Sequence, residues 1–312
     1  MRNLSEISHS FKVMNTDVTA IICETAENRV IAAQALARIE LLFRLSERTL
    51  SRFDEGSELS LLNQSAGQPF RASGMLFEVV EAALEAACLT GGIFDPTILP
   101  CMLQAGYDRS FEKLGTGSVK KSAHEGKCDW RKILLHSADK IIYLPQGCRL
   151  DLGGIGKGWA VDQAYDLLKN YSDFAIDGGG DIRVKGRQSD GTPWNVGVAD
   201  PRGGKADVAI LNVDSGAVCT STTMKRQWQT GGQTRHHLID PRTGEPADSG
   251  VISATVSAPT ATRAEVLAKS ALIAGPIRGL QLIEKQPGCQ GLLILEDGEV
   301  LSVGLGEVQR VA

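Results

Sequence analysis

The chain has 312 residues, of which 42% are hydrophobic and 22% charged, so it is long enough for one large or two ordinary domains and too apolar to be wholly disordered. Its net charge of −4 argues against a nucleic-acid-binding protein, which usually carries a basic surface. No apolar run is long enough to cross a membrane, and the first residues show no signal-peptide pattern. The seven cysteines are scattered without a C-x-x-C pair, so we expect buried free thiols and a reducing, cytoplasmic setting.

The first part of the chain predicts one strand and three helices, followed by a polar insertion. Residues 11–24 alternate in part, as a strand does, and residues 28–50 have an apolar stripe with helical spacing. That stripe consists of Val30, Ala33, Leu36, Ala37 and Leu41. A loop and a short helix are expected over 51–63, and a second long helix over 74–91 ends at two glycines. The polar, lysine-rich residues 108–131 predict an exposed insertion.

Short strands, hairpins and three further helices follow. Strands are expected at 132–136, 140–144, 148–152, 174–177, 182–186, 194–199, 207–213, 217–220, 237–240 and 253–259. Helices are expected at 158–170, 262–275 and 276–286, and residues 291–303 form a closing hairpin with Asp297-Gly298 at its turn. Helices and strands are intermixed with few βαβ units, which predicts an α+β fold with mixed, largely antiparallel sheets and packed helices. We expect residues 1–312 to form a single domain, with two intertwined lobes as the alternative.

Two glycine-rich segments could contact an anionic ligand. Residues 151–162 pass from a strand through a glycine loop with Lys157 into a helix, so backbone N–H groups and a helix N-terminus could face a phosphate. The loop matches neither the Walker A nor the G-x-G-x-x-G motif, and a tight turn with a solvated lysine explains it as well. The turn from Asp177 to Asp181 contains three glycines, more than a two-residue hairpin needs. That surplus favours a turn that contacts a ligand.

Two histidines and a late helix offer further polar groups. His236 and His237 are adjacent, so on a strand they would point to opposite faces and could not bind one metal ion together. One of them could act as an acid or base near neutral pH. Thr262 and Glu265 have the spacing of a capping box, and Glu265 with Lys269 forms a favourable i,i+4 pair. A purely structural role explains these last two pairs without any chemistry.

Taken in order, these segments and several others resemble the ApbE-type FAD:protein FMN transferases. The matching segments are FKVMNT (11–16), SRFDEGSELSLLN (51–63), GGIFDPT (91–97), DLGGIGKGWAVD (151–162), DGGGDIRVKG (177–186), WNVGVADP (194–201), AVCTS (217–221), HHLIDPRTGEP (236–246) and AEVLAKSALIAG (264–275). They are collinear and span nearly the whole chain, so chance does not explain the match.

The resemblance implies an ApbE-like fold and a transfer reaction. Members of this family take FAD, move its FMN half onto a threonine or serine hydroxyl of a target flavoprotein and release AMP, and they use Mg²⁺. The acceptor is implied to carry a D-x-x-x-x-[AG]-T type of segment. Two rival functions stay open: an FAD pyrophosphatase that passes FMN to water, and a non-catalytic FAD-binding or flavin-delivery protein.

The resemblance also implies roles for individual residues. His237 would be the base, and Asp240 its orienting neighbour. Lys157 would lie near the FAD phosphates, and Asp162 would help to hold the nucleotide half. The residues implied to contact FAD are Met14, Asn63, Asp95, Lys157, Asp162, Gly178, Gly179, Gly180, Asp181, Thr220 and Ser221.

The implied magnesium site departs from the family pattern. The family supplies an Asp and, four residues later, a Thr, together with the main-chain carbonyl just before the loop lysine. Here those positions hold Glu265, Lys269 and Gly156, so we expect the Gly156 carbonyl and Glu265 as the remaining ligands. An ammonium cannot ligate Mg²⁺, and Lys269 could instead replace part of the ion's charge. Thr222 also stands where the family has a glycine after the Thr-Ser pair.

Overall fold

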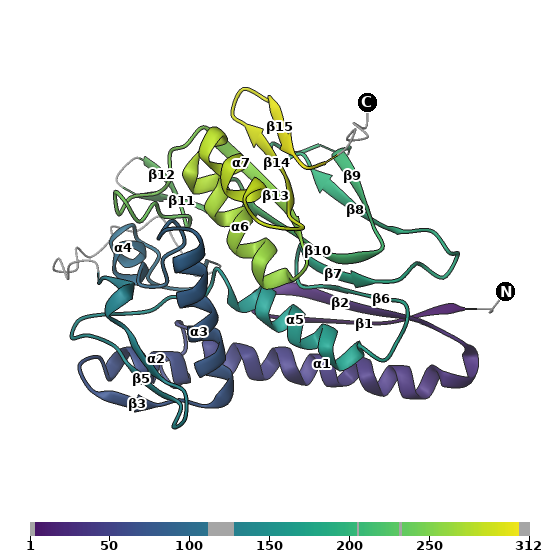
Figure 1. Ribbon diagram of the computed structural model, residues 1–312, viewed down its shortest axis with the longest axis horizontal. Coiled ribbons are helices and arrows are strands. Elements are labelled where there is room, and N and C mark those ends of the chain that lie inside the picture. Colours follow the sequence, from purple (N-terminus) through teal and green to yellow (C-terminus); the bar gives the residue numbers. More distant parts are fainter. Residues whose placement is uncertain (1–3, 112–127, 205, 231–232, 306–312) are drawn as a thin grey trace.

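A sheet of eight strands forms the centre of the protein in the computed structural model, which describes residues 4–111, 128–204, 206–230 and 233–305 (Figure 1). Its strands follow the order β1-β2-β6-β7-β10-β13-β14-β15. Their bounds are β1 (Ser5–Val13), β2 (Thr16–Glu24), β6 (Phe174–Asp177), β7 (Asp181–Lys185), β10 (Ser215–Thr222), β13 (Val251–Ala258), β14 (Gln290–Leu295) and β15 (Val300–Val303). The polar insertion predicted over 108–131 falls mostly outside the described residues.

Three smaller sheets complete the strands. They are β3 (Pro69–Arg71), β5 (Ile141–Tyr143) and β4 (Leu134–His136) in that order, the β8 (Trp194–Ala199) and β9 (Asp207–Val213) hairpin, and the β11 (Gln227–Thr230) and β12 (Gln233–His236) hairpin. Every strand pairing within the described part of the chain is antiparallel. The predicted α+β class with largely antiparallel sheets is therefore confirmed.

Helices cover one face of the large sheet, and the β8–β9 hairpin covers the other. The α-helices are α1 (Arg29–Leu50), α2 (Glu58–Gln64), α3 (Gly74–Leu89), α4 (Leu99–Gln104), α5 (Gly156–Leu168), α6 (Ala261–Ala274) and α7 (Pro276–Glu284). Helices α1, α5 and α6 pack on the sheet, while α2, α3 and α4 gather at one end of α1 (Figure 1). The alternation along β10 serves both faces: Cys219 joins the helix-side core, and Val218 joins the hairpin-side core. That residues 1–312 form a single domain stays a prediction.

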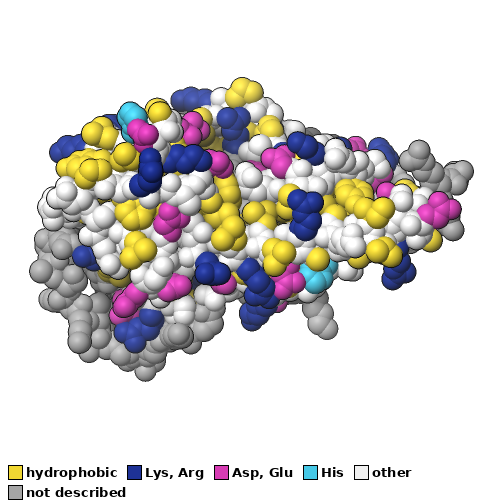
Figure 2. Space-filling view, turned by 90° about the horizontal axis from the view of Figure 1, so that it is seen from below, with side chains coloured by type: hydrophobic (Ala, Val, Ile, Leu, Met, Phe, Trp, Pro, Cys, Tyr) yellow, Lys and Arg dark blue, Asp and Glu magenta, His cyan; other side chains and the backbone are white. Residues whose placement is uncertain are grey.

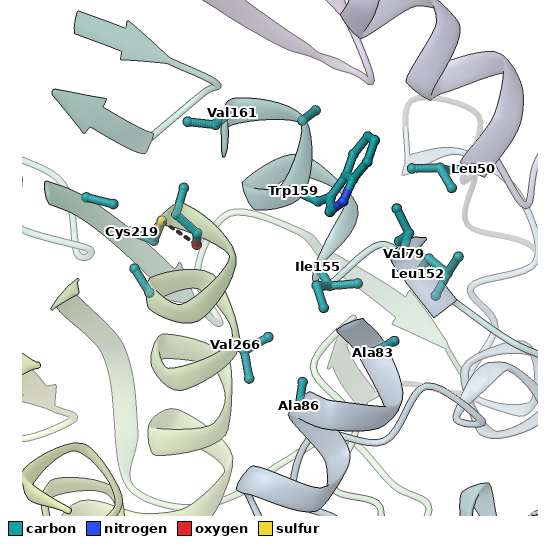
Figure 3. Close-up of a cluster of buried hydrophobic side chains, with 14 of the residues drawn as sticks. Leu50, Val79, Ala83, Ala86, Leu152, Ile155, Trp159, Val161, Cys219 and Val266 are labelled. Carbon is teal, nitrogen blue, oxygen red and sulfur yellow. Dashed lines mark hydrogen bonds between the residues drawn. The ribbon is translucent and has the colours of Figure 1, made fainter. Parts of the chain in front are cut away.

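The glycine loop before α5 rests on the helix-side core. Figure 3 shows Ile155 facing Ala86 on α3 and Val266 on α6, while Trp159 lies on the side toward Leu50. Leu152, just before the glycines of the loop, joins the same cluster. Because Ile155 and Leu152 are buried almost completely, their packing against the core fixes one side of the loop. The other side faces a cavity, which is described below.

The predicted strand over 11–24 is in fact a hairpin. Strands β1 and β2 pair with Val13 opposite Thr16, and Met14 and Asn15 make the two-residue turn between them. Both turn residues have positive φ, 52° and 55°, as a type I′ turn requires. The backbone N–H of Met14 donates a hydrogen bond of 2.7 Å to Glu47 on α1. The signal missed in the sequence was Asn15, which tolerates the left-handed region better than most residues.

The apolar stripe predicted for α1 lies mainly on the solvent-exposed face of the helix, so that prediction is wrong. Leu36 is buried, but Val30 and Leu41 are 69% and 68% exposed. The face that packs on the sheet is instead Ala32, Leu36, Ile39 and Phe43. Figure 2, which views the molecule from the side of α1, shows hydrophobic side chains spread among charged ones on this surface.

Several smaller expectations also differ from the structure. Residues 148–152 and 237–240 are not strands, although Ile239 forms an isolated bridge with Pro246. All seven cysteines are free, but Cys88 is exposed and Cys128 only partly buried. Among the described residues, no helix combines the length and apolar character needed to cross a membrane.

Candidate functional site

A two-part hollow, here called the central cavity, brings the glycine-rich segments together. The smaller part has a volume of about 120 Å³ and the larger about 420 Å³. The residues that line both parts are Gly153, Lys157, Arg226, His237 and Lys269. Of the residues implied to form the site, the smaller part adds Met14 and Gly156, and the larger adds Gly179, Gly180, Asp181, Thr220, Ser221 and Glu265. Sequence segments far apart in the chain thus converge on one cavity.

Lys157 connects the glycine loop to two carboxylates. Its ammonium forms an ion pair with the buried Asp181 and lies 3.8 Å from Glu265 Oε1. Glu265 Oε2 accepts a 2.8 Å hydrogen bond from the backbone N–H of Gly158. Only glycine fits at position 158, because a Cβ there would lie 2.7 Å from the carbonyl oxygen of Ala261. The first turn of α5 is therefore clamped against the first turn of α6.

The turn between β6 and β7 presents backbone to the cavity. Gly179 and Gly180 have φ of 76° and 94°, in the region that favours glycine. The N–H of Gly178 donates to the carbonyl of Asp181 at 2.9 Å, and the N–H of Gly180 donates to Asp177 at 2.7 Å. Gly178 packs toward Val161, so the surface offered to a ligand consists of Gly179, Gly180 and Asp181.

His237 follows β12 directly and is surrounded by aromatic and basic groups. Its Nδ1 is buried and has no hydrogen-bond partner in the part of the chain that the structure describes. Burial, and then the charges of Lys269 and Arg226, lower the pKa of His237 well below its usual 6.5, while a backbone hydrogen bond with Arg226 opposes part of this shift. The imidazole is therefore neutral at pH 7 and can accept a proton. His236 points elsewhere, because its Nε2 bonds to the carbonyl of Ala247 at 3.0 Å.

An aromatic wall with a buried ion pair closes the smaller part of the cavity. Arg52 Nε lies 2.7 Å from Asp151, and both side chains are less than 10% exposed. The Arg52 guanidinium lies 4.1 Å from the ring centre of Phe53 and 4.5 Å from that of Tyr107. The Tyr107 ring in turn stacks on Trp228. Arg52, Phe53 and Asp151 lie in segments that matched the family, but no site role was predicted for them. Tyr107, Trp228 and Arg226 lie outside the matched segments, and only the fold brings them together.

Two residues implied to contact FAD, Asn63 and Asp95, and the implied orienting neighbour of His237, Asp240, are engaged in other interactions. Asn63 exchanges two hydrogen bonds with the backbone of Leu150, at 2.9 and 2.7 Å. Asp240 accepts hydrogen bonds from Arg242 at 2.7 to 3.1 Å. Asp95 accepts from Thr97 and lines a small hollow behind His237.

Asp162 holds the beginning of α6 rather than facing the central cavity. Its carboxylate accepts hydrogen bonds from the backbone N–H groups of Ala261 and Thr262, from the Thr262 hydroxyl and from Arg183. The capping box predicted at Thr262 and Glu265 is wrong: the N-cap is Thr260, whose hydroxyl accepts from the N–H of Arg263. The residue at the N-cap lies two positions earlier than predicted, which leaves Glu265 free to reach Gly158.

Comparison with known proteins agrees with this geometry. The sequence matches the ApbE family over residues 14–293. It is 32% identical over 303 residues to the FAD:protein FMN transferase of Treponema pallidum, with 90% of this chain and 83% of that protein covered. The chain therefore belongs to the ApbE family.

A further relative is also named as an FAD:protein FMN transferase, and two solved structures share the fold. The FAD:protein FMN transferase of Haemophilus influenzae is 27% identical, with 93% of this chain and 87% of that protein covered. The crystal structure of the ApbE protein of Thermotoga maritima superimposes with a TM-score of 0.84 at 27% identity, and 96% and 97% of the two chains are covered. The flavin transferase ApbE of Vibrio cholerae has the same fold, with a TM-score of 0.79 at 23% identity. The ApbE-like fold inferred from the motifs is confirmed.

The residues at the implied magnesium position do not fit a divalent cation. Both oxygens of Glu265 already face positive groups, the N–H of Gly158 and the ammonium of Lys157. Four residues later, Lys269 supplies a second ammonium instead of an oxygen ligand. Within the described ranges, no group of three Asp, Glu, His or Cys side chains could hold a metal ion. A cation beside Glu265 would be repelled by two ammonium groups, so this geometry disfavours the predicted ligands Gly156 and Glu265.

Proposed function

We propose that this protein is an FAD:protein FMN transferase, which moves FMN from FAD onto a threonine or serine hydroxyl of a flavoprotein and releases AMP. The observation that carries the proposal is the central cavity itself: in a chain of the ApbE family, a neutral histidine, a loop lysine and a glycine turn meet at one place. The curated relatives carry the same activity in their names, which supports the assignment.

The reaction requires a base, a cradle for the diphosphate and an acceptor that can reach it. The acceptor oxygen bonds to the phosphorus of the FMN half, the bond from that phosphorus to the AMP phosphate breaks, and AMP leaves. His237 accepts the hydroxyl proton, because its imidazole is neutral and its Nδ1 is unpartnered among the described residues. The backbone of Gly179 and Gly180 and the ammonium of Lys157 line the larger part of the cavity, where phosphates would lie.

The proposal extends to the context of the reaction. Residues 1–312 would act as one ApbE-like domain, which the near-complete mutual coverage with the Thermotoga maritima structure supports. All seven cysteines are free, which supports a cytoplasmic location. The partner would be a flavoprotein with the acceptor segment described above.

The decisive experiment uses the purified full chain with FAD and an acceptor protein that carries a D-x-x-x-x-[AG]-T segment. We expect equal amounts of AMP and of acceptor that stays fluorescent under denaturing electrophoresis, and no flavin on an acceptor whose threonine is replaced by alanine. Equal AMP and free FMN would identify a pyrophosphatase instead. FAD that binds but stays intact with the acceptor present would identify a flavin-binding protein.

A further inference from the structure

Lys269 carries a positive charge to the place where the two parts of the central cavity meet. Its half-buried side chain lines both parts and reaches across to the glycine loop, where a methyl group at Gly154 would overlap its ammonium. The neighbouring carboxylates are engaged elsewhere: Asp151 pairs with Arg52 at 2.7 Å, and Glu265 accepts from the N–H of Gly158. A half-buried ammonium in this position is costly unless an anion joins it.

Arg226 adds a second cation to the lining of the central cavity. It lines both parts of the cavity, as Lys269 does. Burial lowers the pKa of Lys269 from its usual 10.5, Glu265 and Asp151 oppose this change, and the charges of Lys157 and Arg226 add to it. Positive charges that line one cavity destabilise one another. A ligand with two negative charges would relieve that repulsion, and a diphosphate has this charge.

We propose that Lys269 and Arg226 bind the diphosphate of FAD directly, with the Lys269 ammonium acting in place of a divalent cation, so that FAD binds without Mg²⁺. This inference rests on the proposed use of FAD. A lysine ammonium offers three donors and a compact charge, which suits two neighbouring phosphate groups. Gly154 belongs to the same arrangement, because any side chain at this position would displace the ammonium.

The test measures the dissociation constant of FAD by quenching of flavin fluorescence, in EDTA and in MgCl₂. For the wild-type protein we expect the two values to agree within about twofold. K269M should weaken binding in EDTA by about 10- to 100-fold, the usual loss for a hydrogen bond to a charged group. G154A should weaken it in the same direction, and K269R should recover most of the affinity. K285M removes an exposed lysine at the end of α7 and serves as the matched control.

The outcomes separate this inference from the proposed function. Wild-type binding that EDTA abolishes and Mg²⁺ restores would overturn the inference and leave the use of FAD intact. Unchanged affinity in K269M, with the fold verified by circular dichroism, would also overturn it. If FAD binds neither in EDTA nor in MgCl₂, the proposed function is wrong, and the inference is wrong with it. K269T supplies a hydroxyl ligand in place of the ammonium, so its FAD binding should become stronger with added Mg²⁺.

Discussion

Two regions on either side of Lys157 differ in whether their charged and polar groups have partners within the protein. At the junction of α5 and α6, the carboxylates of Asp162 and Glu265 each accept hydrogen bonds from backbone N–H groups. Across the cavity, His237 has a buried ring nitrogen without a partner among the described residues, and Lys269 lies beside carboxylates that are bonded elsewhere. In the first region the charged groups have their partners within the protein. In the second region they have polar atoms that a ligand could still bond.

The difference separates residues that hold the site from residues that act in it. A buried polar group without a partner costs free energy, so a chain keeps such groups mainly where a ligand completes them. By this reasoning, changes at the α5–α6 junction should lower stability, and changes across the cavity should lower binding or rate.

The largest effect is expected from H237A. Removing the base should lower the transfer rate by about 10²- to 10⁴-fold while the affinity for FAD changes little. The measurement is the initial rate of AMP release with FAD and acceptor saturating, together with FAD titration. H236A is the matched control, because its imidazole bonds to the carbonyl of Ala247 outside the cavity. An equal loss of rate in H236A would contradict the assignment of the base.

D162A should act on stability instead. The change removes four hydrogen bonds and leaves the largely buried Arg183 without its carboxylate, which stands 2.6 Å away in the intact protein. Loss of one partner of such a pair should reduce the free energy of unfolding by about 3 kcal/mol. Urea unfolding followed by circular dichroism measures it, and D166A, on the exposed side of α5, is the control. A D162A protein that is as stable as wild type but no longer binds FAD would show that Asp162 contributes to ligand binding and not to stability.

The pH dependence tests the electrostatics across the cavity. The pKa of His237 is below 6.5 in the folded protein, so its proton-accepting form persists as the pH falls through 6.5 and is lost only at lower pH. The unfolded chain binds that proton first, so the free energy of unfolding should decrease as the pH falls below 6.5.

The charge of Lys269 is the second cause of this shift, after burial. K269M should therefore raise the pKa of His237 toward 6.5 without reaching it. NMR titration of the histidine ring protons measures the change, with the His237 signal assigned by its loss in H237A. K285M should leave the titration unchanged. A His237 titration that is identical in K269M and wild type would show that the two groups do not interact.

Local patterns predicted the elements better than the contacts between them. The helix over 74–91 and the helices after residue 260 were placed within a few residues, because capping signals and apolar spacing are local. The stripe on α1 was misplaced, since two apolar faces compete on that helix and only packing against the sheet selects one. The ordered motifs identified the family, but they could not reveal Arg226, which enters the site through the β11–β12 region and belongs to no local pattern.

The smallest expected effect concerns Asn63. The family resemblance places it against FAD, and the structure places it on α2 with its side chain bonded to the backbone of Leu150. Its amide donates to the Leu150 carbonyl and accepts from the Leu150 N–H, and so joins segments 87 residues apart. N63A should reduce the free energy of unfolding by about 1–2 kcal/mol, because two backbone groups lose their partner.

N63D keeps the acceptor and loses the donor, so its loss of stability should be smaller. Q64A changes the exposed neighbour on the same helix and should change nothing. Urea unfolding and FAD titration on the same samples distinguish the two roles. Leu150 lies just before the glycine loop, so FAD affinity should fall at most slightly if Asn63 only positions that segment. A large loss of affinity in N63A with stability preserved would mean that Asn63 contacts the ligand after all.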